Sequence, residues 1–190
     1  MMQKQFNMNK IIFGFVGQMA SGKDTAANYL AEKYGGKNFS FSGMLADVLK
    51  RFYLEITRDN YIKISEALRE KFGEDLMSKT LAEDISSDDH QIISVSNVRR
   101  PSDVAHLKNL PGFVLVEIFA DPKTRYERLT KRGEKSDDKS KTYEQFLADH
   151  QRSTELTINE IAQTAKYKID NNGSLEELYK QLDDLISKFK

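Results

Sequence analysis

Cysteine and tryptophan are absent from this chain of 190 residues, and only three prolines occur in it. Without cysteine the protein can form neither a disulfide framework nor a thiolate metal site, which is typical of a reducing compartment, and we expect a cytoplasmic location. No apolar run approaches the roughly 20 residues that span a bilayer, and residues 1–10 lack the apolar segment of a signal peptide. Lysine plus arginine and aspartate plus glutamate number 29 each, so no net charge directs the protein to nucleic acid or membrane.

Strand-like and helix-like segments alternate along the chain, and its length fits a single domain with at most a small appended lid. Strand patterns occur at about residues 10–16, 37–41, 91–95, 113–119 and 166–169. Helical patterns occur at about residues 23–34, 45–52, 61–83 with a break at Gly73, 122–132 and 174–189. This alternation predicts an α/β fold in which five parallel strands carry helices on both faces. In such folds the ligand binds at the carboxyl ends of the strands.

Two capping boxes predict where late helices begin, one at Thr142 with Gln145 and one at Ser174 with Glu177. Residues 133–141, which precede the first of these two helices, are polar and charged, and they predict a mobile loop. The last helix is expected to bury an apolar face formed by Leu175, Leu178, Leu182, Leu185 and Phe189.

The most informative segment is Gly-Gln-Met-Ala-Ser-Gly-Lys-Asp-Thr at residues 17–25, which matches the P-loop pattern Gly-x-x-x-x-Gly-Lys. An apolar run at residues 11–16 precedes it, and a helical pattern follows it, as a P-loop requires. Glycines let the backbone N–H groups of such a loop point at a phosphate, and the helix N-terminus adds positive charge. The segment therefore predicts a triphosphate site formed by Gly17, Ala20, Ser21, Gly22, Lys23, Asp24 and Thr25.

Three segments together resemble the P-loop kinases of small molecules: the Ser-Gly-Lys-Asp-Thr turn at 21–25, the arginine-rich stretch 124–132 and the tail 165–178. The tail is similar to that of dephospho-CoA kinases, and the Gly-Lys-Asp-Thr loop is similar to that of deoxynucleoside monophosphate kinases. The resemblance implies a three-layer α/β/α P-loop NTPase fold with a five-stranded parallel sheet and a small helical lid. One domain would span residues 1–190, with a core at 10–132 and 164–190, an acceptor-binding helical region at about 42–90 and a lid at about 125–152.

The resemblance also implies ATP and Mg²⁺, but two residues depart from the expected magnesium site. Asp24 stands where the P-loop has a hydroxyl residue, and Ser96 stands where related kinases have the Asp of a Val-Ile-Asp-Gly-Ile-Arg pattern. In one interpretation carboxylate and hydroxyl have changed places, so that Asp24 and Ser96 hold the metal together. In another, Asp24 only caps the helix and Thr25 supplies the hydroxyl. A third interpretation is that catalysis has been lost.

Several basic residues are candidates for binding the transferred phosphate, in addition to Lys23. Arg99 directly follows the third strand, where the family pattern has an arginine that contacts the acceptor's phosphate or the lid. Arg125, Arg128 and Arg132 have the spacing of one helix face. In the related kinases arginines of the lid neutralise charge during transfer, which favours a catalytic role for Arg128 and Arg132. The turn containing Asn172 and Gly173 corresponds to a loop near the adenine in relatives.

These patterns predict an ATP-dependent kinase that phosphorylates a small nucleotide-like acceptor, in particular a (deoxy)nucleoside monophosphate, as a monomer or homodimer. Arg51, Arg58 and Arg69 are candidates for binding an acceptor phosphate, and Phe41 or Tyr61 for stacking on a base. Dephospho-CoA kinase is the alternative enzyme, but its hydroxyl acceptor needs a general base, for which Asp47 is the nearest candidate. An ATP-binding regulator without turnover also remains open, whereas the guanine-reading motifs of a GTPase are missing.

Overall fold

A five-stranded parallel sheet forms the centre of the molecule in the computed structural model, which describes residues 10–132, 142–149 and 153–189. Its strands are β1 (Ile11–Val16), β2 (Lys37–Ser40), β3 (Ile92–Val98), β4 (Phe113–Phe119) and β5 (Tyr167–Asp170). They pair in the order β2-β3-β1-β4-β5, and every pairing is parallel. The predicted α/β fold is confirmed, and β1 lies at the centre of the sheet with the P-loop at its carboxyl end.

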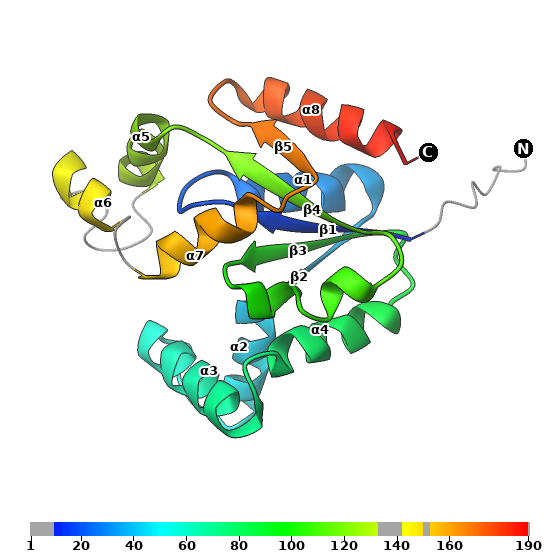
Figure 1. The fold of residues 1–190 in the computed structure, drawn as a ribbon, viewed down its shortest axis with the longest axis vertical. Helices are drawn as coiled ribbons and strands as arrows, with labels where there is room; N and C mark the ends of the chain where they lie inside the picture. Colours follow the sequence, from blue (N-terminus) through cyan, green and yellow to red (C-terminus); the bar gives the residue numbers. More distant parts are fainter. Residues whose placement is uncertain (1–9, 133–141, 150–152, 190) are drawn as a thin grey trace, which may run out of the picture.

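Helices cover both faces of this sheet and make three layers (Figure 1). One face carries α1 (Lys23–Tyr34) and α8 (Leu175–Ser187), and the other carries α2 (Phe41–Arg51), α4 (Leu76–Ser86) and α7 (Ser153–Ala162). The α3 helix (Arg58–Phe72) packs outside α2 and α4 and has no fully buried residue. The remaining elements are the short helices η1 (Pro101–Val104) and η2 (Leu107–Asn109) after β3, α5 (Pro122–Arg132) and α6 (Tyr143–Asp149). None of the helices in the described ranges is long and apolar enough to cross a membrane.

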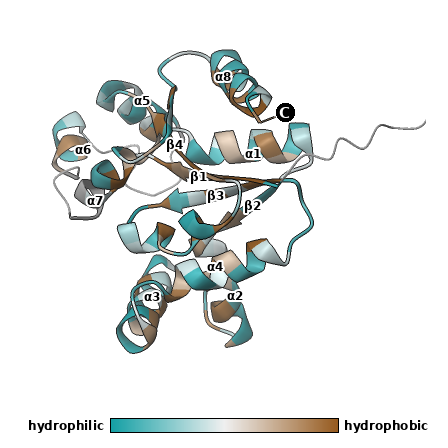
Figure 2. Cartoon of the chain, turned by 45° about the vertical axis from the view of Figure 1, so that its right-hand side comes forward, coloured by the Kyte–Doolittle hydropathy of each residue, from teal (hydrophilic) through white to brown (hydrophobic). Residues whose placement is uncertain are grey.

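The central strand has no solvent-facing side, because all six residues of β1 are buried. Phe13 and Phe15 pack in the cluster under α1 and α8, whereas Ile12 and Val16 pack in the cluster under α2, α4 and α7. Figure 2 shows the same division, with hydrophobic residues on the strands and on the inward sides of the surrounding helices. A strand buried on both faces must be apolar throughout, which explains why this segment lacks the alternation of an edge strand.

Local signals place most of the helix ends where the sequence predicts them. Gly35 ends α1 with φ 62°, and its N–H bonds to the Leu30 carbonyl. Ser174 and Glu177 form the predicted capping box of α8, and the Thr142 and Gln145 hydrogen bonds form the other. The predicted loop at residues 133–141 lies outside the described residues.

Three expectations about these elements are wrong. Leu175 is not buried by α8 but is 54% exposed, because the first turn of the helix overhangs the P-loop instead of the sheet. The second strand ends at Ser40 rather than residue 41, since the Ser40 hydroxyl accepts a hydrogen bond from the Gly43 N–H and so caps α2. The third strand continues past Val95 to Val98.

The extension of β3 includes a β-bulge. The register with β1 shifts between the pairs Gly14–Val95 and Val16–Val98, so two residues of β3 oppose one of β1. Asn97 adopts φ 64° in this bulge. Asn tolerates this left-handed conformation better than most residues, and it stands at the glycine position of the Asp-Gly-Ile-Arg pattern. The bulge changes the direction of the chain at the carboxyl edge of the sheet.

Candidate active site

The loop of residues 17–22 joins β1 to α1 and depends on two glycines. Gly17 has φ 157°, and a Cβ there would lie 2.3 Å from the backbone oxygen of Ile118 in β4. Gly22 is the N-cap of α1 with φ 100°, and a Cβ there would lie 2.2 Å from Nδ2 of Asn171. Only glycine fits such positions without displacing a neighbour. The loop is therefore wedged between the strand ends of β4 and β5, which hold its backbone in a phosphate-binding shape.

Lys23 curls back over the loop that precedes it. The residue is only 8% exposed, and Nζ donates hydrogen bonds to the Gly17 carbonyl at 2.7 Å and the Gln18 carbonyl at 2.9 Å. These two oxygens hold the ammonium group at the opening of the loop. An anion placed among the loop N–H groups would meet this charge directly.

A cavity of about 300 Å³ opens at the amino end of α1. It is lined by Ala20, Gly22, Lys23, Asp24, Thr25, Arg128, Asn171, Gly173 and Leu175. The lining thus brings together the P-loop, the middle of α5 and the turn between β5 and α8, three segments far apart in the sequence. Its charged members are two cations, Lys23 and Arg128, and one carboxylate, Asp24.

Three buried side-chain atoms at this site have no hydrogen-bond partner: Ser21 Oγ, Arg128 Nη1 and Asn171 Oδ1. No other buried side-chain nitrogen or oxygen of the residues described in the structure is left unpaired in this way. Such atoms cost roughly 1–3 kcal/mol each, and proteins rarely keep them without a reason. Arg128 and Asn171 line the cavity, and Ser21 belongs to the P-loop beside it, so these atoms are candidates for binding a ligand.

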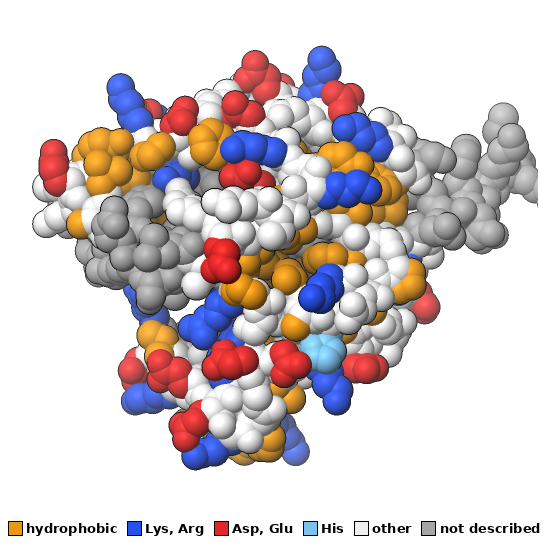
Figure 3. Space-filling view, in the orientation of Figure 1, with side chains coloured by type: hydrophobic (Ala, Val, Ile, Leu, Met, Phe, Trp, Pro, Cys, Tyr) orange, Lys and Arg blue, Asp and Glu red, His pale blue; other side chains and the backbone are white. Residues whose placement is uncertain are grey.

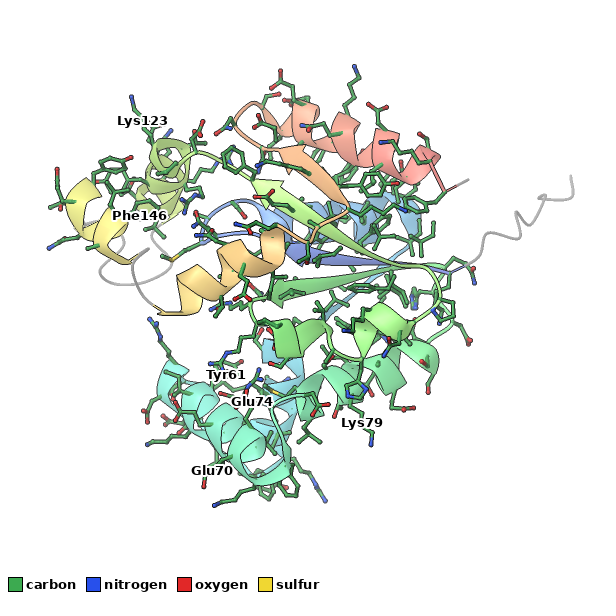
Figure 4. All side chains as sticks on the ribbon, in the orientation of Figure 1. Tyr61, Glu70, Glu74, Lys79, Lys123 and Phe146 are labelled. Carbon is green, nitrogen blue, oxygen red and sulfur yellow. The ribbon has the colours of Figure 1, made fainter. Side chains whose placement is uncertain are left out.

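The arginines of α5 have different surroundings. Arg125 is almost wholly buried, where Nε donates to the Ala120 carbonyl at 3.0 Å, Nη1 donates to the Met19 carbonyl at 3.3 Å, and the guanidinium packs on the Phe146 ring. Arg125 therefore supports the P-loop through the Met19 carbonyl and does not line the cavity. Figure 4 labels Phe146 in α6, beside α5. The side chain of Arg132, the third member of the predicted face, lies outside what the structure describes.

Arg128 lies at the cavity end formed by the β5–α8 turn. Its Nη2 reaches the Gly173 carbonyl at 3.4 Å. Burial lowers the pKa of the guanidinium from its usual value, although it remains charged at neutral pH. No carboxylate among the described residues pairs with it. A half-buried cation of this kind favours an anionic or π-electron-rich ligand.

The turn after β5 adds Asn171 to the site, a residue that the sequence patterns do not predict there. Asn171, not Asn172, lines the cavity, and its Nδ2 donates to the Ser21 carbonyl at 2.8 Å. The Asn172 side chain instead accepts from the Asp121 N–H at 2.7 Å and donates to Asp170 at 2.7 Å. Gly173 lines the cavity with its backbone. The sequence contains no signal that separates two adjacent asparagines, because only the direction of β5 determines which one points at the P-loop.

The predicted metal residues offer oxygen atoms at the same edge. Asp24 and Thr25 both line the cavity from the first turn of α1. Gly22 is the N-cap of α1, and Asp24 is the acidic residue of its first turn, where a negative charge complements the helix dipole. Ser96 is buried, and strand alternation places it on the face of β3 that Ile92 presents to α1. No group of three His, Cys, Asp or Glu residues suited to a metal occurs in the described ranges.

The other candidate arginines differ in their exposure and in their hydrogen-bond partners. Arg99 is exposed just after β3, and its guanidinium has no ion pair among the described residues. Arg51 and Arg58 are also exposed. Arg69, by contrast, is held by hydrogen bonds to Glu74, Ser102 and Asp103. On the face shown in Figure 3, basic and acidic side chains are interspersed and form no broad patch of one sign.

The remaining acceptor candidates lie away from the P-loop cavity. Phe41 is the first residue of α2 and is buried in the core, and Tyr61 packs against the same core. Asp47 is highly exposed, pairs with Lys50 at 3.3 Å and lines a separate cavity of about 380 Å³ with Arg51 and Asp84.

The chain is similar to several known proteins. A UPF0200 protein of Hyperthermus butylicus is 28% identical over 180 residues, which cover 95% of each chain. A UPF0200 protein of Methanocaldococcus jannaschii is 28% identical over 178 residues, which cover 93% of this chain and 89% of that protein. The solved structure of shikimate kinase from Acinetobacter baumannii, in complex with shikimate, has the same P-loop kinase-like fold, with a TM-score of 0.57, 17% identity and 95% of each chain covered. The sequence profile of the AAA domain family matches residues 16–146, most of this chain including its P-loop, and the protein belongs to that family.

Proposed function

We propose that this protein is an ATP-dependent phosphotransferase that moves the γ-phosphate of ATP to a nucleotide-like acceptor, a (deoxy)nucleoside monophosphate. The observation that carries the proposal is the set of unpaired buried atoms of Ser21, Arg128 and Asn171 around the P-loop cavity. A protein that did not bind a ligand there would keep these groups unsatisfied at a cost in stability. Phosphoryl transfer needs positioned charge rather than covalent chemistry, and this cavity supplies such charge.

In this proposal Lys23 and the N–H groups of residues 17–25 hold the triphosphate. The Lys23 ammonium exchanges its bonds to the Gly17 and Gln18 carbonyls for phosphate oxygens of higher charge. The amino end of α1 adds its partial positive charge. Arg128, Gly173 and Leu175 then lie at the far end of the cavity, where a guanidinium, a backbone turn and an exposed leucine suit the flat face of the base. Arg132 remains a candidate for the transferred phosphate.

The Asp24 carboxylate fits a site that also holds Mg²⁺. Facing a triphosphate alone, this carboxylate would be repelled. A divalent cation between the two removes the repulsion, and Mg²⁺ commonly binds one or two protein oxygens together with substrate phosphates. Asp24 and Thr25 line the cavity, Ser96 is buried in β3 and is not part of the lining, and all three offer only oxygen donors, as Mg²⁺ prefers. When bound, the metal would neutralise charge on the phosphates; Asp24 would carry the carboxylate that relatives have at the Ser96 position.

The acceptor is proposed to lie between the sheet edge and the helical region of residues 42–90, with the residues at about 125–152 forming a lid over the core. An acceptor that already carries an ionised phosphate needs no general base. The one base candidate for a hydroxyl acceptor, Asp47, is exposed and lines a different cavity. This position favours a nucleoside monophosphate over dephospho-CoA.

Incubation with ATP, Mg²⁺ and a panel of acceptors tests the proposal. The panel contains ribo- and deoxyribonucleoside monophosphates, dephospho-CoA and shikimate. We expect ADP to form with one monophosphate and with neither of the last two. ADP formation only with dephospho-CoA would establish the alternative kinase, and tight ATP binding without ADP from any acceptor would point to a regulator.

A variant of Asp24 tests the metal assignment separately. Asp24→Ala is expected to abolish most magnesium-dependent turnover, because the carboxylate that holds the metal is removed. ATP binding without magnesium should be unchanged or tighter, because the variant also lacks the carboxylate's repulsion of the phosphates. Glu32→Ala, an exposed carboxylate on the same helix, is the matched control. Intact magnesium-dependent turnover in Asp24→Ala would show that Asp24 does not hold the metal.

A further inference from the structure

The turn after β3 is organised by one buried carboxylate. Asp103, in η1, is 4% exposed. Its Oδ2 accepts hydrogen bonds from two successive backbone N–H groups, those of Arg99 at 2.9 Å and Arg100 at 3.0 Å. Charge-assisted bonds of this kind are stronger than bonds between neutral groups. Asp103 therefore determines the direction in which the chain leaves the β-bulge at Asn97.

The other oxygen of the same carboxylate joins this turn to α3. Asp103 Oδ1 accepts from Nη2 of Arg69 at 3.0 Å, and both side chains are nearly buried. Nη1 of Arg69 also donates to the Ser102 hydroxyl at 3.1 Å and to the Glu74 carbonyl at 2.7 Å. Figure 4 shows Glu74 in the segment after α3, facing the loop that follows β3. One carboxylate thus connects the carboxyl edge of the sheet to the outermost helix.

This arrangement leaves the Arg99 side chain as the exposed cation of the turn. Arg69 uses its guanidinium within the network, and Arg100 lies 3.7 Å from Glu74. Arg99 contributes only its backbone N–H to Asp103, and its guanidinium has no partner among the residues that the structure describes. The carboxylate therefore holds the Arg99 backbone while the side chain extends into solvent at the ligand-binding edge of the sheet.

We propose that Asp103 is a positioning residue that aims Arg99 at the anionic group of the acceptor, and that the Arg69–Asp103 ion pair keeps this turn in register with α3. The inference rests on the proposed function, since it assigns Arg99 to an anionic acceptor. Arg99 binds the anion, and Asp103 acts on it only through the backbone.

The Arg69–Asp103 network is not explained by its contribution to the stability of the fold. A buried ion pair is often no more stabilising than a packed hydrophobic pair, because desolvation offsets the Coulomb attraction. What the pair adds is geometry: two N–H groups and one guanidinium are bound in definite directions by a single side chain. Displacing a binding group by about 1 Å has large effects on phosphate positioning.

Titration of the isotope-labelled full chain with inorganic phosphate tests the proposal by NMR. Backbone amide shifts of residues 97–100 report phosphate at the turn, and those of Gly22 and Lys23 report phosphate at the P-loop. Arg99→Gln is expected to remove the response at the turn and so defines that site. Asp103→Asn is expected to weaken phosphate binding at the turn roughly tenfold, the equivalent of one charge-assisted hydrogen bond, and to leave the P-loop affinity unchanged.

Two further variants separate positioning from loss of folding. Asp59→Asn, an exposed carboxylate on α3 that pairs with Lys63, is the matched control and should bind phosphate as the wild type does. Because Asp103→Asn leaves the Arg69 charge buried, Arg69→Gln/Asp103→Asn replaces the pair by two amides and keeps the protein folded. It should show the same tenfold loss at the turn.

Three results would overturn the proposal: no phosphate response at the turn of the wild type, an unchanged response in folded Asp103 variants, or an equal loss at the turn and the P-loop. The last result would mean that Asp103 only supports the fold. Phosphate binding requires no turnover, so failure of the acceptor panel would refute the proposed function without changing the outcome of this titration.

Discussion

Replacing Gly22 by alanine is the sharpest test of how the P-loop is built. The residue combines two constraints, a φ of 100° and a Cβ position 2.2 Å from Nδ2 of Asn171. The Asn171 amide cannot simply move away, because it is buried and bonded to the Ser21 carbonyl at 2.8 Å. Gly35 offers a matched control on the same helix: its φ is 62°, and nothing lies within 4 Å of its Cβ position.

The two constraints contribute separately to the free energy of unfolding. A left-handed conformation costs an alanine about 1–2 kcal/mol. Expelling the Asn171 amide breaks its bond and leaves the buried Ser21 carbonyl unpaired, which adds about 1–3 kcal/mol. Gly22→Ala is therefore expected to destabilise the protein by about 2–5 kcal/mol, and Gly35→Ala by about 1–2 kcal/mol. Once Asn171→Ala has removed the amide, Gly22→Ala should cost no more than Gly35→Ala.

Urea denaturation of the four single and double variants measures these differences, and calorimetric titration with ATP measures the effect on the cavity. Gly22→Ala should also weaken ATP binding, since the displaced amide lines the site. An equal cost of Gly22→Ala with and without Asn171 would refute the reasoning, because the contact between the loop and β5 would then carry no energy. A cost for Gly22→Ala no larger than that of Gly35→Ala would refute it as well.

Three further predictions follow from the same geometry. Asn97→Ala should lower the free energy of unfolding by about 1 kcal/mol because alanine fits φ 64° poorly, whereas Asn97→Gly should change it little; equal denaturation midpoints for both would contradict this. Arg128→Met should weaken ATP binding at least tenfold, which is about the loss of one charged contact. The melting temperature of the ligand-free protein should stay unchanged or rise, because the substitution removes a half-buried cation with an unpaired Nη1. Burial alone would raise the pKa of Asp88, but bonds from Lys37 and His90 outweigh it and lower the pKa. The ionised carboxylate stabilises the fold at pH values above its pKa in the unfolded chain, which is about 4, and this stabilisation is lost as the pH falls below that value. The difference in free energy of unfolding between wild type and Asp88→Asn, measured with urea, should therefore shrink from about pH 6 to about pH 3.

Much of the fold follows from local features of the chain. The apolar run of β1, the glycine at the end of α1 and the two capping boxes each act through neighbours within a few residues, and the structure forms the elements that they predict. Polar strand ends and bulges are harder to predict from the local sequence. The extension of β3 through Ser96 and Asn97 depends on pairing with β1, which no local pattern contains.

The P-loop motif determined by itself where the cavity forms, since the phosphate-binding geometry of residues 17–25 needs only a strand, a tight loop and a helix in succession. The tertiary structure alone decided which distant side chains complete it. Arg125 supports the loop instead of facing the cavity, Asn171 rather than its neighbour reaches Ser21, and Leu175 leaves the core for the cavity rim. The physical reason is the same in each case: burial and hydrogen-bond partners come from contacts between segments more than a hundred residues apart, and helical spacing carries no information about them.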